Sequence, residues 1–164
     1  MNKQDILTLY RYNQWTTAKI LNCTADVTLE QFIAPASFPH GGLRSTLVHA
    51  SFAEWIWRNR WEGTSPTVRF KSEDFPDFQS LRARWMEEEA KLMTFVHGLT
   101  DERLTDTFQY QDTKGNPHEQ ILWKAMLHVI NHGTQHKTEA AAMLTELGHS
   151  PGDIDMIYFF IEKE

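Results

Sequence analysis

The chain has 164 residues, 41% of them hydrophobic and 12% aromatic, so it can form one core without disulfides or a structural metal. Its net charge of −6 argues against a nucleic-acid partner, and its single cysteine, Cys23, excludes an intrachain disulfide framework. There is no basic start followed by an apolar run, and no stretch approaches the roughly 20 apolar residues of a membrane span. We therefore expect a cytoplasmic protein that does not insert into membranes.

The first half of the chain predicts two long helices. Residues 3–24 contain neither Pro nor Gly, and a loop rich in both residue types follows them. The second helix is predicted over residues 43–61, where Ser45 or Thr46 could cap its start and Gly63 comes just after its end. The long connections that follow each helix leave the connectivity of the fold open.

The second half predicts two more long helices and a break between them. The third runs from a cap at Asp77 to Gly98, with apolar residues at helical spacing. Residues 105–120 lose that period, and we interpret them as a short hairpin or an irregular excursion. The fourth helix is predicted from about Pro117 to Leu147, and a short helix follows near the C-terminus. Together these elements predict an all-α four-helix bundle in a single domain over residues 1–164.

Three histidines in the predicted fourth helix are spaced four residues apart: His128, His132 and His136. Neighbours at this spacing share a helix face, and two imidazoles can bind one metal ion with each nitrogen about 2.0–2.1 Å from it. The outer two are about 12 Å apart along the helix axis, so all three cannot bind one ion. A site for one ion therefore needs an adjacent pair and further ligands from another part of the fold.

The apolar stripe of the fourth helix indicates which pair faces inward. His136 lies in that stripe, His132 lies at its edge, and His128 lies further round, where it would orient a ligand or line the mouth of a site. In the second helix, His49 precedes Phe52 by three residues and lies on the inward stripe. One such histidine alone is more often a core residue satisfied by a hydrogen bond, but the pair and the third histidine together favour a metal site.

Other polar residues carry weaker signals. Glu139 follows His136 by three residues, so it could add a ligand, accept a hydrogen bond from a ligand, or be a surface glutamate. The run Glu87, Glu88 and Glu89 is typical of a solvated face, although one member could reach the core. Surface roles are predicted for four histidines at loops or element ends: His40, His97, His118 and His149. The H-E-x-x-H motif and the di-iron motif are absent.

Several segments resemble the DinB/YfiT-like superfamily of metal-dependent proteins: LVHASFAEWIW around His49, HVINHGTQH, LGHSPGDIDMIYFF and, more weakly, YRYNQW. The resemblance implies a DinB-like bundle with up-down-down-up connectivity, usually a homodimer. It also implies a divalent metal site whose ligands are His49, His132 and His136. Many members have Arg-Gly-Gln after the last ligand, whereas this chain has Lys137, Thr138 and Glu139.

Three neutral imidazoles leave the ion with an open position, as in catalytic sites. Such an ion could lower the pKa of a bound thiol or of bound water. Some members of the superfamily resemble S-transferases for low-molecular-weight thiols such as bacillithiol, mycothiol or glutathione. The leading hypothesis is a metal-dependent transferase that joins a small thiol to an electrophile. The alternatives are a metal-dependent small-molecule hydrolase and a non-catalytic, dimeric metal- or ligand-binding module of a stress response. Zinc or nickel is favoured as the metal, and iron or manganese would also suit the site.

Overall fold

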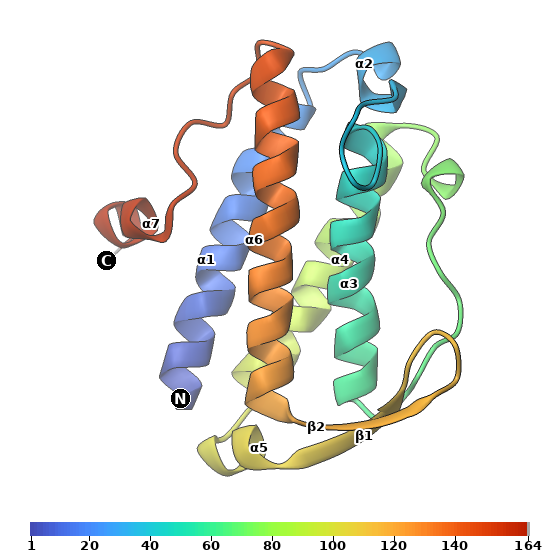
Figure 1. Ribbon diagram of the computed structural model, residues 1–164. Coiled ribbons are helices and arrows are strands. Elements are labelled where there is room, and N and C mark those ends of the chain that lie inside the picture. Colours follow the sequence, from blue (N-terminus) through green and yellow to red (C-terminus); the bar gives the residue numbers. More distant parts are fainter. Residues whose placement is uncertain (164) are drawn as a thin grey trace.

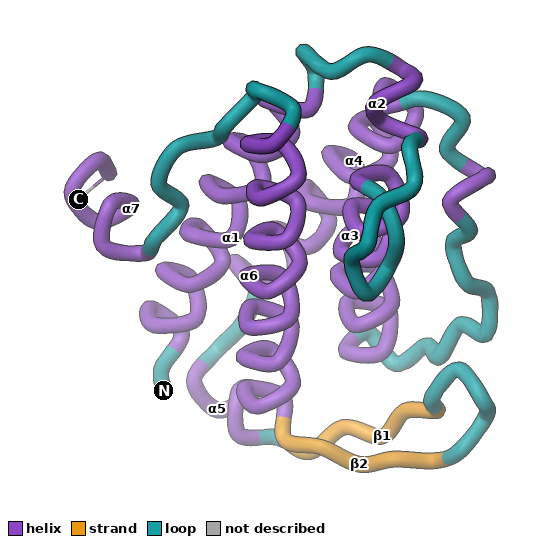
Figure 2. Tube along the Cα trace, turned by 45° about the horizontal axis from the view of Figure 1, so that its top comes forward, coloured by secondary structure: helices purple, strands orange, loops and turns teal. Residues whose placement is uncertain are grey.

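The structure is a computed structural model that describes residues 1–163; residue 164, the last of the predicted domain, lies outside this range. The described chain is mostly helical, with one small antiparallel sheet, as expected from the sequence (Figures 1 and 2). In chain order the elements are α1 (Lys3–Thr24), α2 (Leu29–Ile33), α3 (Leu43–Trp61), the 3-10 turn η1 (Ser72–Asp74), α4 (Phe78–His97), α5 (Asp101–Thr105), β1 (Thr107–Gln111), β2 (Pro117–Ile121), α6 (Leu122–Glu146) and α7 (Met156–Lys163).

The four long helices pack in a ring. Helix α6 contacts α1 and α3, and α4 contacts the same two helices from the other side. Following the colours of Figure 1 along the chain, α1 and α6 run upward in that view, whereas α3 and α4 run downward. Among residues 1–163, none of the helices combines the length and the apolar character that a membrane span requires.

The start of α3 differs from the prediction in its cap. Neither Ser45 nor Thr46 caps the helix; its N-cap is Gly42, which has no side chain to bond the first turn. A Cβ atom at this position would lie 1.9 Å from the carbonyl oxygen of Ala34, so the returning loop leaves no room for a side chain. The close approach of two backbone segments, rather than a capping bond, therefore determines where α3 begins.

The start of α6 was predicted five residues too early, at Pro117. Residues 117–121 instead form β2, which pairs antiparallel with β1. The tip between the strands is held by Asp112, whose Oδ1 accepts hydrogen bonds from the backbone N–H of Lys114 at 2.8 Å and of Asn116 at 2.9 Å. This turn brings residues 117–121 back along β1, so the predicted hairpin is confirmed. Its second strand includes the residues that were predicted to begin the helix.

A buried polar layer divides the core into two hydrophobic clusters. One cluster includes Ile6 and Met126, and the other includes Leu47 and Trp85. Along the long helices, the buried polar residues other than Thr24 and Thr46 lie between the members of the two clusters. They are Asn13, Thr16 and Thr17 on α1, Ser51, Glu54, Arg58 and Arg60 on α3, Glu88 on α4, and His136 and Lys137 on α6. The polar layer therefore lies at the level of the histidines of α6.

Candidate metal centre

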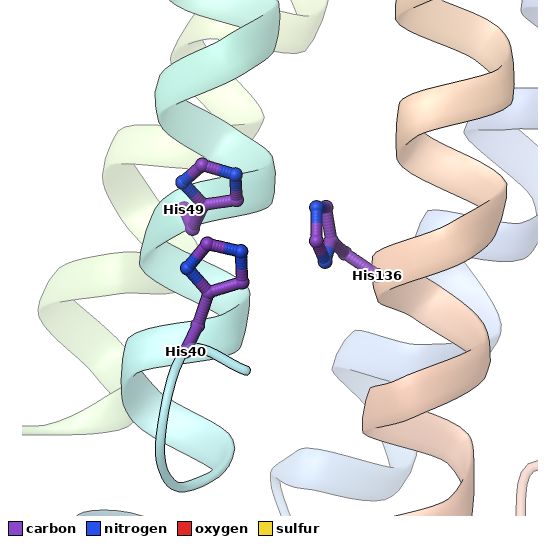
Figure 3. Close-up of side chains that lie close together, drawn as sticks. All are labelled: His40, His49 and His136. Atoms are coloured by element: carbon purple, nitrogen blue, oxygen red, sulfur yellow. The ribbon is translucent and has the colours of Figure 1, made fainter. Parts of the chain in front are cut away.

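Helices α3 and α6 bring the three predicted histidines together. The ring centroids of His49 and His136 are 4.7 Å apart, those of His49 and His132 are 4.9 Å apart, and those of His132 and His136 are 4.4 Å apart. Figure 3 shows His136 projecting from α6 toward the ring of His49 on α3. The four-residue spacing places both α6 rings on one face, and the contact between the helices supplies the third ring.

The closest contact joins the Nε2 atoms of His49 and His132, which are 3.0 Å apart. Two nitrogens at this separation can both lie about 2.0–2.1 Å from one ion. The Nδ1 atom of His132 is buried and has no hydrogen-bond partner among residues 1–163. This atom faces away from Nε2, so an ion shared with His49 would not reach it. The fit to a metal rests instead on the donor set: three imidazoles from two helices, two of whose nitrogens lie 3.0 Å apart, match the ligands of a divalent ion.

His40 is a fourth histidine of this cluster, and the predicted surface role for it is wrong. Its ring stacks on His49 with the centroids 3.8 Å apart, and it meets His136 edge-on at 4.7 Å (Figure 3). One nitrogen from each of His40, His49 and His136 lies within 4.8 Å of the other two. The structure therefore offers His40 as well as His132 as a ligand beside the other two histidines.

Two glycines bring His40 to this position. Gly41 has a φ of 87°, in the left-handed region that favours glycine, and its N–H donates to the carbonyl oxygen of Phe38 at 2.8 Å. Gly42 then lies directly against Ala34. The sequence signal was the run Pro-His-Gly-Gly, in which a histidine precedes a tight return into the helix that carries His49.

Glu139 orients one of the predicted ligands. Its Oε2 atom accepts a hydrogen bond from Nδ1 of His136 at 2.8 Å. A carboxylate at this position fixes the proton on Nδ1 and leaves the Nε2 lone pair free for a metal. Of the three roles considered for Glu139, the structure supports that of a hydrogen-bond acceptor. His128 is exposed and packs against Trp57, with the ring centroids 5.3 Å apart.

The environment keeps the central rings neutral. The pKa of His132 is lowered to about 3, first by burial and then by the nearby rings of His136 and His49. The pKa of His49 is lowered to about 4, again by burial first and then by His40 and His136. Burial also lowers the pKa of His40. At neutral pH these rings therefore carry free lone pairs, which is the form that binds metals.

Two cavities border the cluster, and both are lined by His49 and Phe52. One of about 390 Å³ is lined by His40, His49 and Arg69 together with neighbouring side chains. The other, of about 330 Å³, is bordered by His49 and His132, and its walls include Trp57, Arg60 and Tyr110. A small molecule bound in either cavity would lie within reach of the imidazoles.

Comparisons with known proteins agree with the resemblance of the sequence segments. The family model described as the DinB family matches residues 1–163. The chain is also similar to "Protein DinB" of Bacillus subtilis (strain 168), with 21% identity over 166 residues that cover 94% of each chain. The family match thus extends over all four long helices and over the segments that carry the clustered histidines.

Proposed function

This chain belongs to the DinB family, and from that premise we propose that His49, His132 and His136 bind one divalent metal ion, zinc or nickel before iron or manganese. The observation that carries the proposal is the 3.0 Å separation of the Nε2 atoms of His49 and His132, from two different helices. The hydrogen bond from His136 to Glu139 supports it, because outer carboxylates of this kind accompany metal-bound histidines.

We further propose that the ring of long helices is the up-down-down-up bundle that the family implies. The directions seen in Figure 1 support this connectivity, with α1 and α6 running one way and α3 and α4 the other. In this arrangement α3 and α6 are adjacent and antiparallel. His49, in the first half of α3, therefore lies opposite His132 and His136 near the middle of α6.

The proposed reaction is the transfer of a small thiol to an electrophile. A divalent ion in this site would supply Lewis acidity, which lowers the pKa of a thiol at its open position. The sulfur forms a bond to the electrophilic carbon, the leaving group departs with its electron pair, and the thiol proton passes to solvent. The family resemblance to thiol transferases and the cavity of about 330 Å³ beside His49 and His132 support this choice.

The protein's own residues would prepare this reaction in three ways. The neutral rings of His49 and His132 offer lone pairs without competition from protons at neutral pH. Glu139 fixes the orientation of His136. The loop that carries His40 places a further imidazole against His49, which can supply a fourth nitrogen.

The test is turnover of a thiol with a generic electrophile, 1-chloro-2,4-dinitrobenzene, by protein loaded with zinc or nickel. We expect chloride release that depends on the metal and is lost in His132→Ala. The control is His97→Ala, which removes an exposed histidine at the end of α4 that lines neither cavity. Circular dichroism would verify that each variant is folded.

The other outcomes separate the alternative functions. Hydrolysis of 4-nitrophenyl acetate without any thiol, again lost in His132→Ala, would replace the transferase proposal with the hydrolase. Stoichiometric metal binding without turnover of either substrate would favour the non-catalytic binding module. Absence of metal binding by the wild-type protein would overturn all three.

A further inference from the structure

Arg60, in the last turn of α3, is an unusually buried arginine. Only 7% of its surface is exposed. Its guanidinium lies over two aromatic rings, 4.7 Å from the ring centroid of Trp57 and 4.8 Å from that of Tyr110. These contacts hold a flat cation in a fixed position at the junction of α3 and the hairpin.

Within residues 1–163, no carboxylate forms an ion pair with Arg60, and its buried Nε has no hydrogen-bond partner. Arg58, two residues earlier and similarly buried, differs: its Nη2 donates to Glu88 at 2.9 Å, and its Nη1 bonds Glu62 at 2.5 Å. Asp112 is the carboxylate whose charge raises the pKa of Arg60, but that carboxylate accepts hydrogen bonds from the backbone of the hairpin turn. Arg60 is therefore a largely buried arginine that no described carboxylate pairs with; its Nε is buried and unbonded, while its Nη groups remain accessible.

Such a group is costly to keep. A buried charge without a partner destabilises a protein, which is why buried arginines are normally paired. Burial also lowers the pKa of Arg60, against smaller effects of Tyr110 and Asp112 that raise it. A residue with this cost is expected where a ligand supplies the counter-charge.

The cavity in front of Arg60 leads to the histidine cluster. Arg60 lines the cavity of about 330 Å³ that also borders His49 and His132. The aromatic side chains of Phe52 and Trp57 also line it, and so does Asp112, whose carboxylate accepts hydrogen bonds within the hairpin turn. The cavity thus combines a cation, aromatic side chains and metal-binding groups.

We propose that this cavity binds a small carboxylate-bearing molecule, whose carboxylate pairs with the guanidinium of Arg60 while its body lies against Phe52 and Trp57. The next step rests on the proposed function: one of the two co-substrates, the thiol or the electrophile, carries the carboxylate. Its reactive atom then faces His49 and His132. The fork of the guanidinium suits the two oxygens of a carboxylate.

The first experiment does not depend on metal or on turnover. Isothermal titration of the metal-free protein compares benzoate with benzamide, which has the same shape without the charge. We expect benzoate to bind at least about tenfold more tightly, since a charge-assisted hydrogen bond contributes about 1.5–3 kcal/mol. Arg60→Met should abolish that preference, and Arg60→Lys should retain part of it. The control Arg11→Met removes an exposed cation on α1 and should change nothing.

Thermal unfolding distinguishes a binding role from a structural one. Benzoate should raise the melting temperature of the wild-type protein but not that of Arg60→Met. Without ligand, Arg60→Met should melt no lower than the wild type, because methionine keeps the apolar stem and removes the unpaired charge. A marked fall in its melting temperature would indicate a structural arginine. Equal binding of benzoate and benzamide, or no binding of either, would overturn the proposal.

A second experiment places the ligand and identifies the co-substrate. In cobalt-loaded protein, benzoate protons should relax faster when they lie beside the histidines; relaxation unaffected by cobalt would place the probe elsewhere and overturn the cavity assignment. In turnover, Arg60→Met should lower kcat/KM at least about tenfold for either 3-mercaptopropionate or chloroacetate, and not for the matching amide. If no turnover exists but benzoate still prefers Arg60, the transferase proposal fails and the carboxylate site stands.

Discussion

His132 and His40 are both next to His49, but the fold holds them differently. His132 is on a long packed helix, whereas His40 is on a loop whose path depends on two glycines. We expect His132→Ala to weaken zinc binding by more than about 100-fold, because loss of even an outer partner costs about 10–100-fold. His40→Ala should have a smaller effect, and His118→Ala none. Competition with a chelating dye would measure the three affinities. If His40→Ala were as damaging as His132→Ala, both histidines would hold the ion; if only His40→Ala were damaging, the loop histidine would take the place of His132.

The lowered pKa values of His49 and His132 predict how stability depends on pH. An unfolded histidine has a pKa near 6.5, whereas these rings have values of about 4 and about 3 in the fold. Below pH 6.5 the unfolded chain therefore binds more protons, and the free energy of unfolding falls as the pH is lowered toward 4. Urea unfolding of metal-free protein between pH 7 and 5 would measure this slope. His132→Phe should make it shallower, and an unchanged slope would contradict the assigned burial.

Between helices α1, α3 and α6, the polar layer is organised around the buried amine of Lys137. Its Nζ donates to Oδ1 of Asn13 at 2.7 Å and to the backbone oxygen of the same residue at 3.0 Å, and it lies 3.9 Å from Oε1 of Glu54. Glu54 in turn accepts hydrogen bonds from Asn13 and Trp85, both at 2.8 Å. One network therefore joins all four long helices at the level of the metal centre.

Removing one charge of this network should lower the free energy of unfolding more than removing both charges. Lys137→Met leaves the buried carboxylate of Glu54 without its cation, and we expect the free energy of unfolding to fall by about 3–5 kcal/mol. Adding Glu54→Gln should restore part of that loss, because Gln keeps an acceptor for Asn13 and carries no charge. Denaturant unfolding of the two single variants and the double variant gives the coupling energy. Strict additivity would show that the two charges do not interact.

The elements that the sequence predicted well are those with local signals. The bounds of α1 and α3 follow from apolar spacing and from the Gly and Pro of the flanking loops, and the cap at Asp77 is confirmed by its bond to the N–H of Ser80. The wrong start of α6 has a non-local cause, since pairing with β1 decides the conformation of residues 117–121. The short helices α2 and α5 were not predicted, although Thr28 and Gln31 form a capping box at the start of α2.

The candidate site shows the same division between local and distant information. Helical spacing alone placed His132 and His136 on one face and His49 inward, and the three rings do lie together. Spacing could not place His40, because its position depends on how the loop returns past Ala34. Spacing also could not show that Arg60 lacks a carboxylate partner, because that depends on the position of every acidic residue in the folded structure.

For the molecule as a whole, an ion between α3 and α6 should act as a cross-link of the bundle. A ligand at 100 times its dissociation constant stabilises the folded state by about 2.7 kcal/mol. For a chain of this size that corresponds to a rise in melting temperature of about 5–10 °C. Differential scanning calorimetry with zinc and then with a chelator would measure the rise and its reversal. The shift should vanish in His49→Ala, and a shift that persists there would place the ion elsewhere.

We propose that the homodimer implied by the family resemblance forms through the C-terminal helix α7. Phe159 packs against Tyr12 and Trp15 of α1, but Ile157 and Ile161 are one turn apart and 59% and 72% exposed. Two exposed isoleucines on one stripe of a helix are typical of a contact surface, because exposing their apolar surface to water is unfavourable. We expect the wild-type protein to sediment as a dimer.

The variant Ile157→Asp/Ile161→Asp should shift that equilibrium toward the monomer, because each aspartate would have to be buried in the contact. The matched control is Val68→Asp, which changes an apolar side chain that is 66% exposed in the loop before η1. A dimer that survives the double substitution but not the control would place the interface at the loop before η1, whose Arg69 and Phe70 line a cavity beside the histidines. In that case a second copy would also border the cavity that contains Arg69, and ligand access would depend on protein concentration.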